Sequence, residues 1–495
     1  MRGLAAWDRV PSGALDLTDA ETEKQLRIFY TGISDQVPRR VYDATFRQAI
    51  ALRAHSAIME PRYIDADWRS EHGQFYSTTY RRYPSVAHRL HLFSGELPAA
   101  ALHEDKPIAR ALKRETYLGY IVLRPVQAAP IGRTMLAVPP RLRSPRAVVC
   151  QADDQVNLFG MDLRVSGMPF LSQDGQYMRC AQVCAWITAY YHHLRFGSPR
   201  ALPELIATHA GVASDLGRPL PSPGLSVRQV TDAMLGLGLP GEVYDLRQRD
   251  RASVVPFICR YLNSRLPVTV ITSRHAFVLI GYERYVDRDG IRRIRFWRQD
   301  DEAGPYQAVD NWGSDPSGTW QHLVVPLPPK VYLTGEHAEL IAKKHLISRL
   351  KKGTGDDQML ASELVKMGTG ESSVALRSSV MLSNDFKRGI EHRRFPDAIT
   401  ARYLNLPMPR YIWVVEVTDR SARDQDDVAA PDCVLAEAVL DATDHTNDTK
   451  VLAWRCPSGI TRWLADQDSE SHHLVSSEAT PSVVDIPRAP VHELR

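Results

Sequence analysis

The chain has 495 residues, which is more than one hydrophobic core usually organises, so we expect two to four domains. Its 44% hydrophobic and 24% charged residues exclude a disordered or fibrous protein. The formal net charge of +3 neither indicates nor excludes a nucleic-acid partner, because a basic binding surface depends on how charges cluster and not on their sum.

The amino terminus and the cysteines indicate the compartment. The segment "MRGLAAWDRVPSGALDL" lacks the apolar stretch and cleavage pattern of a secretory signal, and no run of 18 apolar residues follows. The six cysteines include no CxxC pair, which argues against a disulfide framework and against a thiolate zinc site. We therefore expect a soluble, cytoplasmic protein with reduced thiols and no membrane contact.

The first 170 residues change in character at about residue 60. We expect residues 1–60 to be a helical segment, with helices over 20–33 and 39–60. In residues 61–170, aromatic and β-branched segments such as "TYLGYIVLRPV" and "VNLFGMDLRV" alternate with Pro, Gly and Asp. This alternation predicts a β-rich accessory region, so that the N-terminal part as a whole combines helices and strands.

Residues 171–330 place helices before strands. Apolar spacing predicts helices over 180–196, 199–211 and 226–240. Strands are expected over 267–272, 275–286 and 291–299, with "DRDG" as the turn between the last two. Helices followed by neighbouring antiparallel strands indicate an α+β domain.

The remaining chain is expected to form a second α+β domain over 331–470 and a flexible tail over 471–495. The domain would contain helices in "EHAELIAKKHLISRLKK" and "DDQMLASELVKMG", and strands in "RYIWVVEV" and "CVLAEAVLDAT". The acidic segment "DRSARDQDDVAAPD" between those strands is expected to be an exposed loop.

Two cysteines open the helix predicted over 180–196. Cys184 would face the core with Val183 and Ile187, where burial makes a thiol unreactive. Cys180 would lie at the helix entrance, where free backbone N–H groups and the helix dipole favour a thiolate. Position therefore distinguishes Cys180 as the candidate nucleophile.

A cysteine nucleophile needs a base and a group that orients the base. Among the 17 histidines, His275 has the most suitable context, because it opens an apolar strand after a polar break. The next strand ends at Asp300 and Asp301, and an acid there could hold the far nitrogen of the imidazole. Asp310 and Asn311 in "VDNWG" are a later alternative.

In this order, the segments "QDGQYMRCAQVCAWITAYYHH", "PVTVITSRHAFVLIGYERY" and "FWRQDDEAGPY" resemble papain-like cysteine peptidases, in particular the bacterial peptidases that process bacteriocin leaders. The resemblance covers residues 171–330. It implies a papain-like domain of helices packed on an antiparallel sheet, with Cys180 as nucleophile, His275 as base, and Asp300 or Asp301 as the orienting acid.

The resemblance also implies a glutamine that stabilises the oxyanion, six residues before the cysteine. This chain has Asp174 at that position, with Gln173 and Gln176 on either side. Either Gln173 or Gln176 could therefore be the oxyanion donor. The family's proline after the acid is replaced by the second aspartate.

The implied activity is hydrolysis of a peptide or isopeptide bond through a thioester, on a protein or peptide substrate. The flanking regions would choose the substrate or bind a regulatory protein partner. The same residues would also suit an acyltransferase of the transglutaminase type, and the unusual glutamine spacing would suit an inert papain-like scaffold.

Other chemistries find less support in the sequence. Neither a cofactor nor a metal is expected, because His192-His193 and His472-His473 lack metal-ligand helix spacing and no HExxH motif occurs. Arginines alternate with aromatic residues in "YRRYP" and "IRRIRFWRQ", but dispersed arginines on solvent faces explain this pattern equally well. We therefore do not expect nucleic-acid binding.

Overall fold

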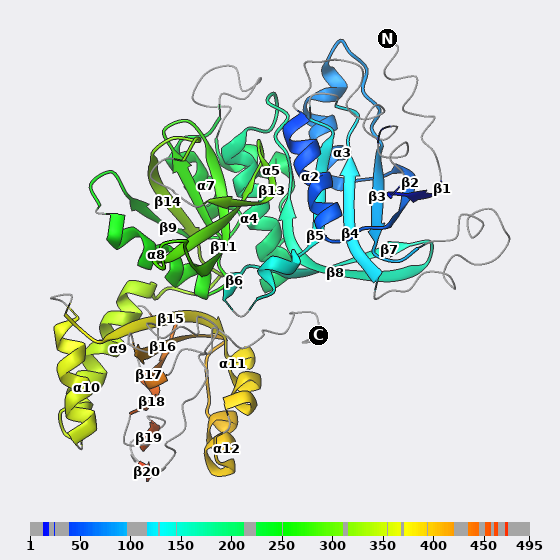
Figure 1. Ribbon diagram of the computed structural model, residues 1–495. Coiled ribbons are helices and arrows are strands. Elements are labelled where there is room, and N and C mark those ends of the chain that lie inside the picture. Colours follow the sequence, from blue (N-terminus) through cyan, green and yellow to red (C-terminus); the bar gives the residue numbers. More distant parts are fainter. Residues whose placement is uncertain are drawn as a thin grey trace.

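The computed structural model describes most of the chain, and its helices and strands form a mixed α+β protein (Figure 1). The described residues are 13–18, 24, 39–96, 116–126, 129–144, 146–211, 224–249, 251–309, 315–353, 355–367, 371–393, 395–419, 434–444, 451–456, 460–463 and 471–473. The α+β class predicted from the sequence is confirmed.

The first sheet has seven antiparallel strands in the order β1-β2-β3-β4-β5-β8-β7. Its strands are β1 (Gly13–Asp16), β2 (Ser56–Tyr63), β3 (Ala87–Phe93), β4 (Tyr117–Leu123), β5 (Ile131–Ala137), β7 (Ala152–Leu158) and β8 (Met161–Phe170). The helices α2 (Arg39–Ala51) and α3 (Ala66–Gln74) accompany this sheet, with the 3-10 turns η2 (Tyr76–Thr78) and η6 (Pro140–Leu142).

Two predictions for the N-terminal part need correction. The helix predicted over 39–60 ends at Ala51, because Arg53 takes a left-handed conformation with φ of 60° that stops the helix. The next residues form β2, whose first four side chains are buried, so segment 1–60 is not purely helical. Apart from Lys24, the helix predicted over 20–33 lies outside the described residues.

The second sheet contains the strands predicted after the cysteines. Its order is β13-β12-β11-β10-β14-β9, and the short β6 pairs with β11. The strands are β6 (Ala147–Val149), β9 (Gly241–Asp245), β10 (Val268–Thr272), β11 (Ala276–Val286), β12 (Arg292–Asp300), β13 (Gly304–Val309) and β14 (Trp320–Pro326), and the helices are α4 (Cys180–Phe196), α5 (Pro203–His209), α7 (Val227–Gly236) and α8 (Arg251–Asn263). The predicted helices and strands of this region are present at nearly the predicted residues.

The third sheet is an antiparallel series from β15 to β20. Its strands are β15 (Val374–Leu382), β16 (Tyr411–Asp419), β17 (Val434–Asp441), β18 (Val451–Arg455), β19 (Ile460–Trp463) and β20 (Ser471–His473), and its helices are α9 (Gly335–Leu350), α10 (Gly355–Lys366), α11 (Ser383–Ile390), the 3-10 turn η8 (Glu391–Arg393) and α12 (Asp397–Asn405). The strand β20 lies within the predicted tail, and residues 474–495 are outside the described residues, as is most of the predicted acidic loop.

Helix α4 is central to the arrangement. It packs against β10 and β11 of the second sheet and against β7 and β8 of the first. Figure 1 shows α4 between these two sheets. Fifteen of its 17 residues are buried, which explains its near-continuous apolar sequence. Helix α11, which follows β15 of the third sheet, is linked to α4 by an ion pair of 2.6 Å between Arg195 and Asp385. The buried apolar side chains of all three parts form one continuous core.

Candidate active site

Helix α4 begins at Cys180 and ends at Phe196, and it is capped by Gly197, whose left-handed conformation with φ of 71° suits a glycine. At the start, the backbone N–H of Arg179 donates to the Gln182 side chain over 2.8 Å. This bond fixes the first turn, so the side chain at the entrance is held in place. Cys180 is partly exposed there and lies against the core.

Cys184 lies one turn further into α4 and is buried, with 1% of its surface exposed. Burial raises the pKa of its thiol well above the usual value, and the nearby charges of Asp301, Cys180 and Asp300 raise it further. A thiol with a raised pKa stays protonated and is a poor nucleophile. The two cysteines therefore differ in exposure as their helix positions predict.

Asp174 organises the loop that leads into α4. One carboxylate oxygen accepts three backbone N–H groups within 2.9 Å, from Gln176, Tyr177 and Met178. The other oxygen accepts the hydroxyl of Tyr76 from the first sheet's side over 2.8 Å. The residue at the family's glutamine position is thus an acceptor that shapes the loop, and not an oxyanion donor.

The two glutamines have different surroundings. The Gln173 amide donates to Glu302 over 2.5 Å, and Glu302 directly follows Asp301. Gln176 is exposed. Of the two, Gln173 is the one tied to the turn that carries the aspartates.

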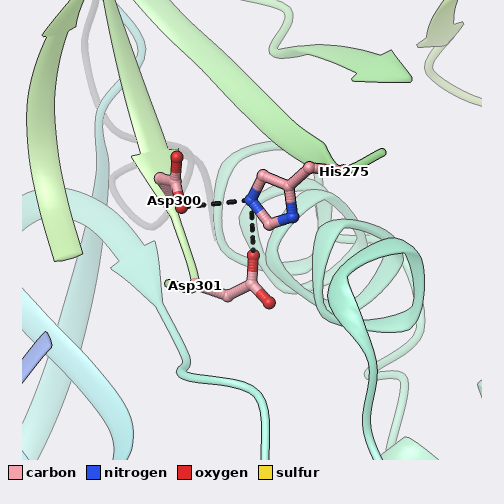
Figure 2. A group of neighbouring side chains, drawn as sticks. All are labelled: His275, Asp300 and Asp301. Carbon is pink, nitrogen blue, oxygen red and sulfur yellow. Dashed lines mark hydrogen bonds and ion pairs between the residues drawn. The ribbon is translucent and has the colours of Figure 1, made fainter. Parts of the chain in front are cut away.

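His275 occupies the turn between β10 and β11. Its backbone N–H donates to the Thr272 hydroxyl over 2.9 Å, which fixes the turn. Its ring Nε2 lies 3.2 Å from an oxygen of Asp300 and 3.5 Å from one of Asp301, while the other ring nitrogen points away from both carboxylates (Figure 2). The Cys180 side chain also interacts with the imidazole and is one of the groups that raise its pKa.

Asp300 is placed by the antiparallel pairing of β11 and β12, in which Val278 is opposite Gln299. The start of β11, beside His275, therefore lies next to the end of β12, which carries Asp300. The Asp300 oxygen that faces His275 also accepts the backbone N–H groups of Glu302 and Ala303, each over 3.0 Å. Its second oxygen forms a 3.1 Å ion pair with Arg298.

The charge states of the two aspartates differ. Burial would raise the pKa of Asp300, but the hydrogen bond with His275 and the charge of Arg298 outweigh it and lower the pKa. For Asp301, burial together with the charge of Asp300 outweighs the attraction of His275 and raises the pKa well above its usual value. Neither oxygen of Asp301 has a hydrogen-bond partner among the described residues. Asp300 is thus the ionised partner of His275, whereas the raised pKa of the buried Asp301 favours its neutral form.

The imidazole of His275 is held in its protonated form. Burial works against the charge, but the hydrogen bonds with Asp300 and Cys180 and the charges of both aspartates raise its pKa to about 11. In the unfolded chain the ordinary value is near 6.5. Between pH 6.5 and about 11, the imidazole of His275 is therefore protonated in the folded protein and neutral in the unfolded chain.

This difference predicts how stability depends on pH. Below pH 6.5 the contribution of His275 to the free energy of unfolding is complete, and it is lost as the pH rises toward about 11. Urea unfolding of the wild type and of His275→Asn at pH 6, 8 and 10 should show a stability difference that shrinks with pH. The exposed His337 provides the control, His337→Asn. A difference that grows with pH would contradict a protonated His275 in the folded protein.

The same three side chains could also hold a cation. One ligand atom each from His275, Asp300 and Asp301 lies within 4.8 Å of the other two. A metal ion would need the deprotonated nitrogen that now binds Asp300, so it would compete with the proton of His275. His275 and Asp300 already bind each other through a hydrogen bond, whereas the Asp301 oxygens have no hydrogen-bond partner among the described residues.

Some site residues were not predicted from the sequence. Arg298 and Thr272 hold Asp300 and the His275 turn, and Arg298 is itself held by a 2.9 Å ion pair to Asp315. Arg298 lies two residues before Asp300, so the alternation of strand side chains could have indicated that both lie on one face. Asp310 and Asn311 lie outside the described residues.

No protein-family model matches the chain, and no curated protein matches it in sequence. Among the described residues, no helix is both long and apolar enough to cross a membrane.

Proposed function

We propose that the protein is a cysteine hydrolase, and more specifically a peptidase that cleaves a peptide or isopeptide bond of a protein substrate. One observation carries the proposal: the His275 ring forms a hydrogen bond with Asp300 and also interacts with the side chain of Cys180. A thiol, a base and an acid that orients the base are the parts that nucleophilic acyl chemistry requires.

The proposed reaction has two halves. At rest, a proton is held on His275 and shared with the Cys180 sulfur through their hydrogen bond. The sulfur attacks the carbonyl carbon, the carbonyl electrons move to oxygen, and the C–N bond then breaks as His275 protonates the leaving amine. A thioester remains. Water gives a proton to His275 and attacks the thioester, the acid product leaves, and the sulfur regains its share of the proton.

The oxyanion formed in each half would be bound by the backbone N–H of Cys180 and by a glutamine amide. Gln173 is favoured over Gln176 because it is tied to the aspartate turn, although its amide would have to leave Glu302. One such donor is typically worth ~3 kcal/mol of transition-state stabilisation.

The position of each group supports a papain-like relationship. The cysteine opens a helix, the histidine precedes a strand, and the acid ends the antiparallel neighbour of that strand. The first and third sheets would select the protein substrate or receive a regulatory partner in the cytoplasm. Transfer of the acyl group to an amine uses the same groups, so a mass-spectrometric product assay with added amine is needed to separate transfer from hydrolysis.

Thiol labelling tests the proposal directly. At pH 7 and limiting iodoacetamide, we expect Cys180 to react about tenfold or more faster than Cys259, which is also partly exposed. Peptide mapping by mass spectrometry measures both sites in one sample. The Cys180→Ala variant should lose the fast label and also any peptide cleavage.

Cys184→Ala is the matched control in the same helix. It should keep the fast label and lose about 1–3 kcal/mol of stability, because it leaves a small cavity in the core. Equal, slow labelling of Cys180 and Cys259 in the folded wild type would indicate an inert scaffold and overturn the proposal.

A further inference from the structure

A cavity that is not lined by Cys180, His275 or Asp300 lies between α2 beside the first sheet and β13 of the second sheet. It has a volume of about 500 Å³, within the range of small-molecule binding pockets. Its walls come from α2, from the η6 turn and from β13, and none of the described residues that line it carries a carboxylate. The described walls of the cavity are therefore positive, neutral polar or apolar, but not anionic.

Two arginines from different elements line the cavity. Arg47 comes from α2, is exposed, and has no ion pair with any part of the chain that the structure describes. Arg141 comes from the η6 turn, where its guanidinium lies 4.0 Å from the centre of the Trp297 ring and donates to the carbonyl of Tyr306 over 3.3 Å. One cation is thus held in place by stacking, and the other can move onto a ligand.

Gln48 supplies a third polar group. Its side chain lines the cavity and is 6% exposed, and its Nε2 has no hydrogen-bond partner among the described residues. A buried amide donor without an acceptor destabilises the fold by roughly the free energy needed to remove that group from water. Because Nε2 is itself buried, an oxygen atom of a ligand would satisfy it after the amide turned toward the cavity.

The wall formed by β13 is rigidly placed against α2. Gly304 has φ of 106°, and a side chain there would meet the Ala44 Cβ at 2.5 Å, so only glycine permits this close packing. At Tyr306, the backbone N–H donates to the Gln299 side chain over 2.8 Å. The cavity-lining polar side chains therefore belong to elements with fixed positions, which lowers the entropic cost of ligand binding.

We infer that this cavity binds a small organic molecule carrying an oxyanion, either a phosphate monoester or a carboxylate. Two arginines and one glutamine line it, and planar guanidinium forks match the oxygens of phosphate and carboxylate groups. The volume exceeds that of an inorganic ion, so the remainder of the ligand would lie along the proline and alanine wall of the cavity. This inference does not depend on the proposed hydrolase activity.

Isothermal titration of the full chain with ribose 5-phosphate, inorganic phosphate and succinate, at constant ionic strength in KCl, tests the site. We expect saturable binding of ribose 5-phosphate or of succinate, which identifies the phosphate or the carboxylate as the recognised group. Arg47→Glu should weaken that binding about tenfold or more, because it replaces a charge-assisted donor by a repelling carboxylate.

Arg40→Glu makes the same charge change two turns away on α2, outside the cavity, and should leave the affinity unchanged. Gln48→Leu should weaken binding while thermal denaturation shows a folded protein. Absence of binding by all three anions to the wild type would overturn the inference. Equal affinity of Arg47→Glu and the wild type would overturn it as well.

Discussion

Replacing Asp300 with asparagine is expected to lower peptide cleavage by about 10³–10⁴-fold while the protein stays folded. Asp300 accepts the hydrogen bond from His275 and carries the negative charge that keeps the imidazole protonated and oriented. An amide would lose that charge and could present its NH₂ group to Nε2. The measurement is kcat/KM on a substrate selected from a peptide library.

Asp301→Asn is the matched control, one residue away on the same turn. Burial raises the pKa of Asp301 and favours its protonated form, whose shape the amide reproduces. We expect cleavage within about tenfold of the wild type and no loss of stability at pH 7, because a buried acid with a raised pKa costs folding energy above its ordinary pKa. Equal losses from the two substitutions would show that the carboxylates act as one coupled pair.

The largest loss of stability is expected in the third sheet, from Arg393→Met. Arg393 is fully buried and forms ion pairs of 2.9 Å with Glu416 and 2.6 Å with Glu437. Removing the cation leaves two buried carboxylates without their main partner, and breaking such a pair typically costs about 3–5 kcal/mol. Urea unfolding followed by tryptophan fluorescence measures it, since Trp413 is buried in β16 of this sheet.

Arg388→Met serves as the comparison, because Arg388 is exposed on the neighbouring helix α11. Its effect should be within about 0.5 kcal/mol of zero. If Arg393→Met were as mild as this control, the buried ion pairs would contribute little, and Glu416 and Glu437 would be neutral in the fold.

The sequence allowed a prediction wherever the position of a site residue follows from the periodicity of one helix or strand. The difference between Cys180 and Cys184 depends on helix position alone, and one amphipathic helix is enough to predict it. The placement of His275 opposite the end of the next strand follows from a short turn between antiparallel strands. Both relations are local or involve neighbouring elements.

The choice between Asp300 and Asp301 could not be made from the sequence, because it depends on the strand end. The pairing of β12 with β13 shifts register between Arg298 and Asp300, and such an irregularity changes which way a side chain points. Nothing in the sequence indicates that Asp174 binds Tyr76, since 98 residues separate the two. Long-range contacts of this kind are set by packing and leave no periodic signal.

The short strand β6 has a practical consequence for dissecting the chain. It follows the η6 turn and precedes β7 of the first sheet, but it pairs with β11 of the second sheet. A fragment that begins at residue 171 would lose this strand, and the loop before Cys180 would lose the phenol that steadies it. A fragment that keeps the candidate site intact therefore has to begin upstream of residue 171 and include the first sheet. We expect the first and second sheets to fold together and not as separate domains.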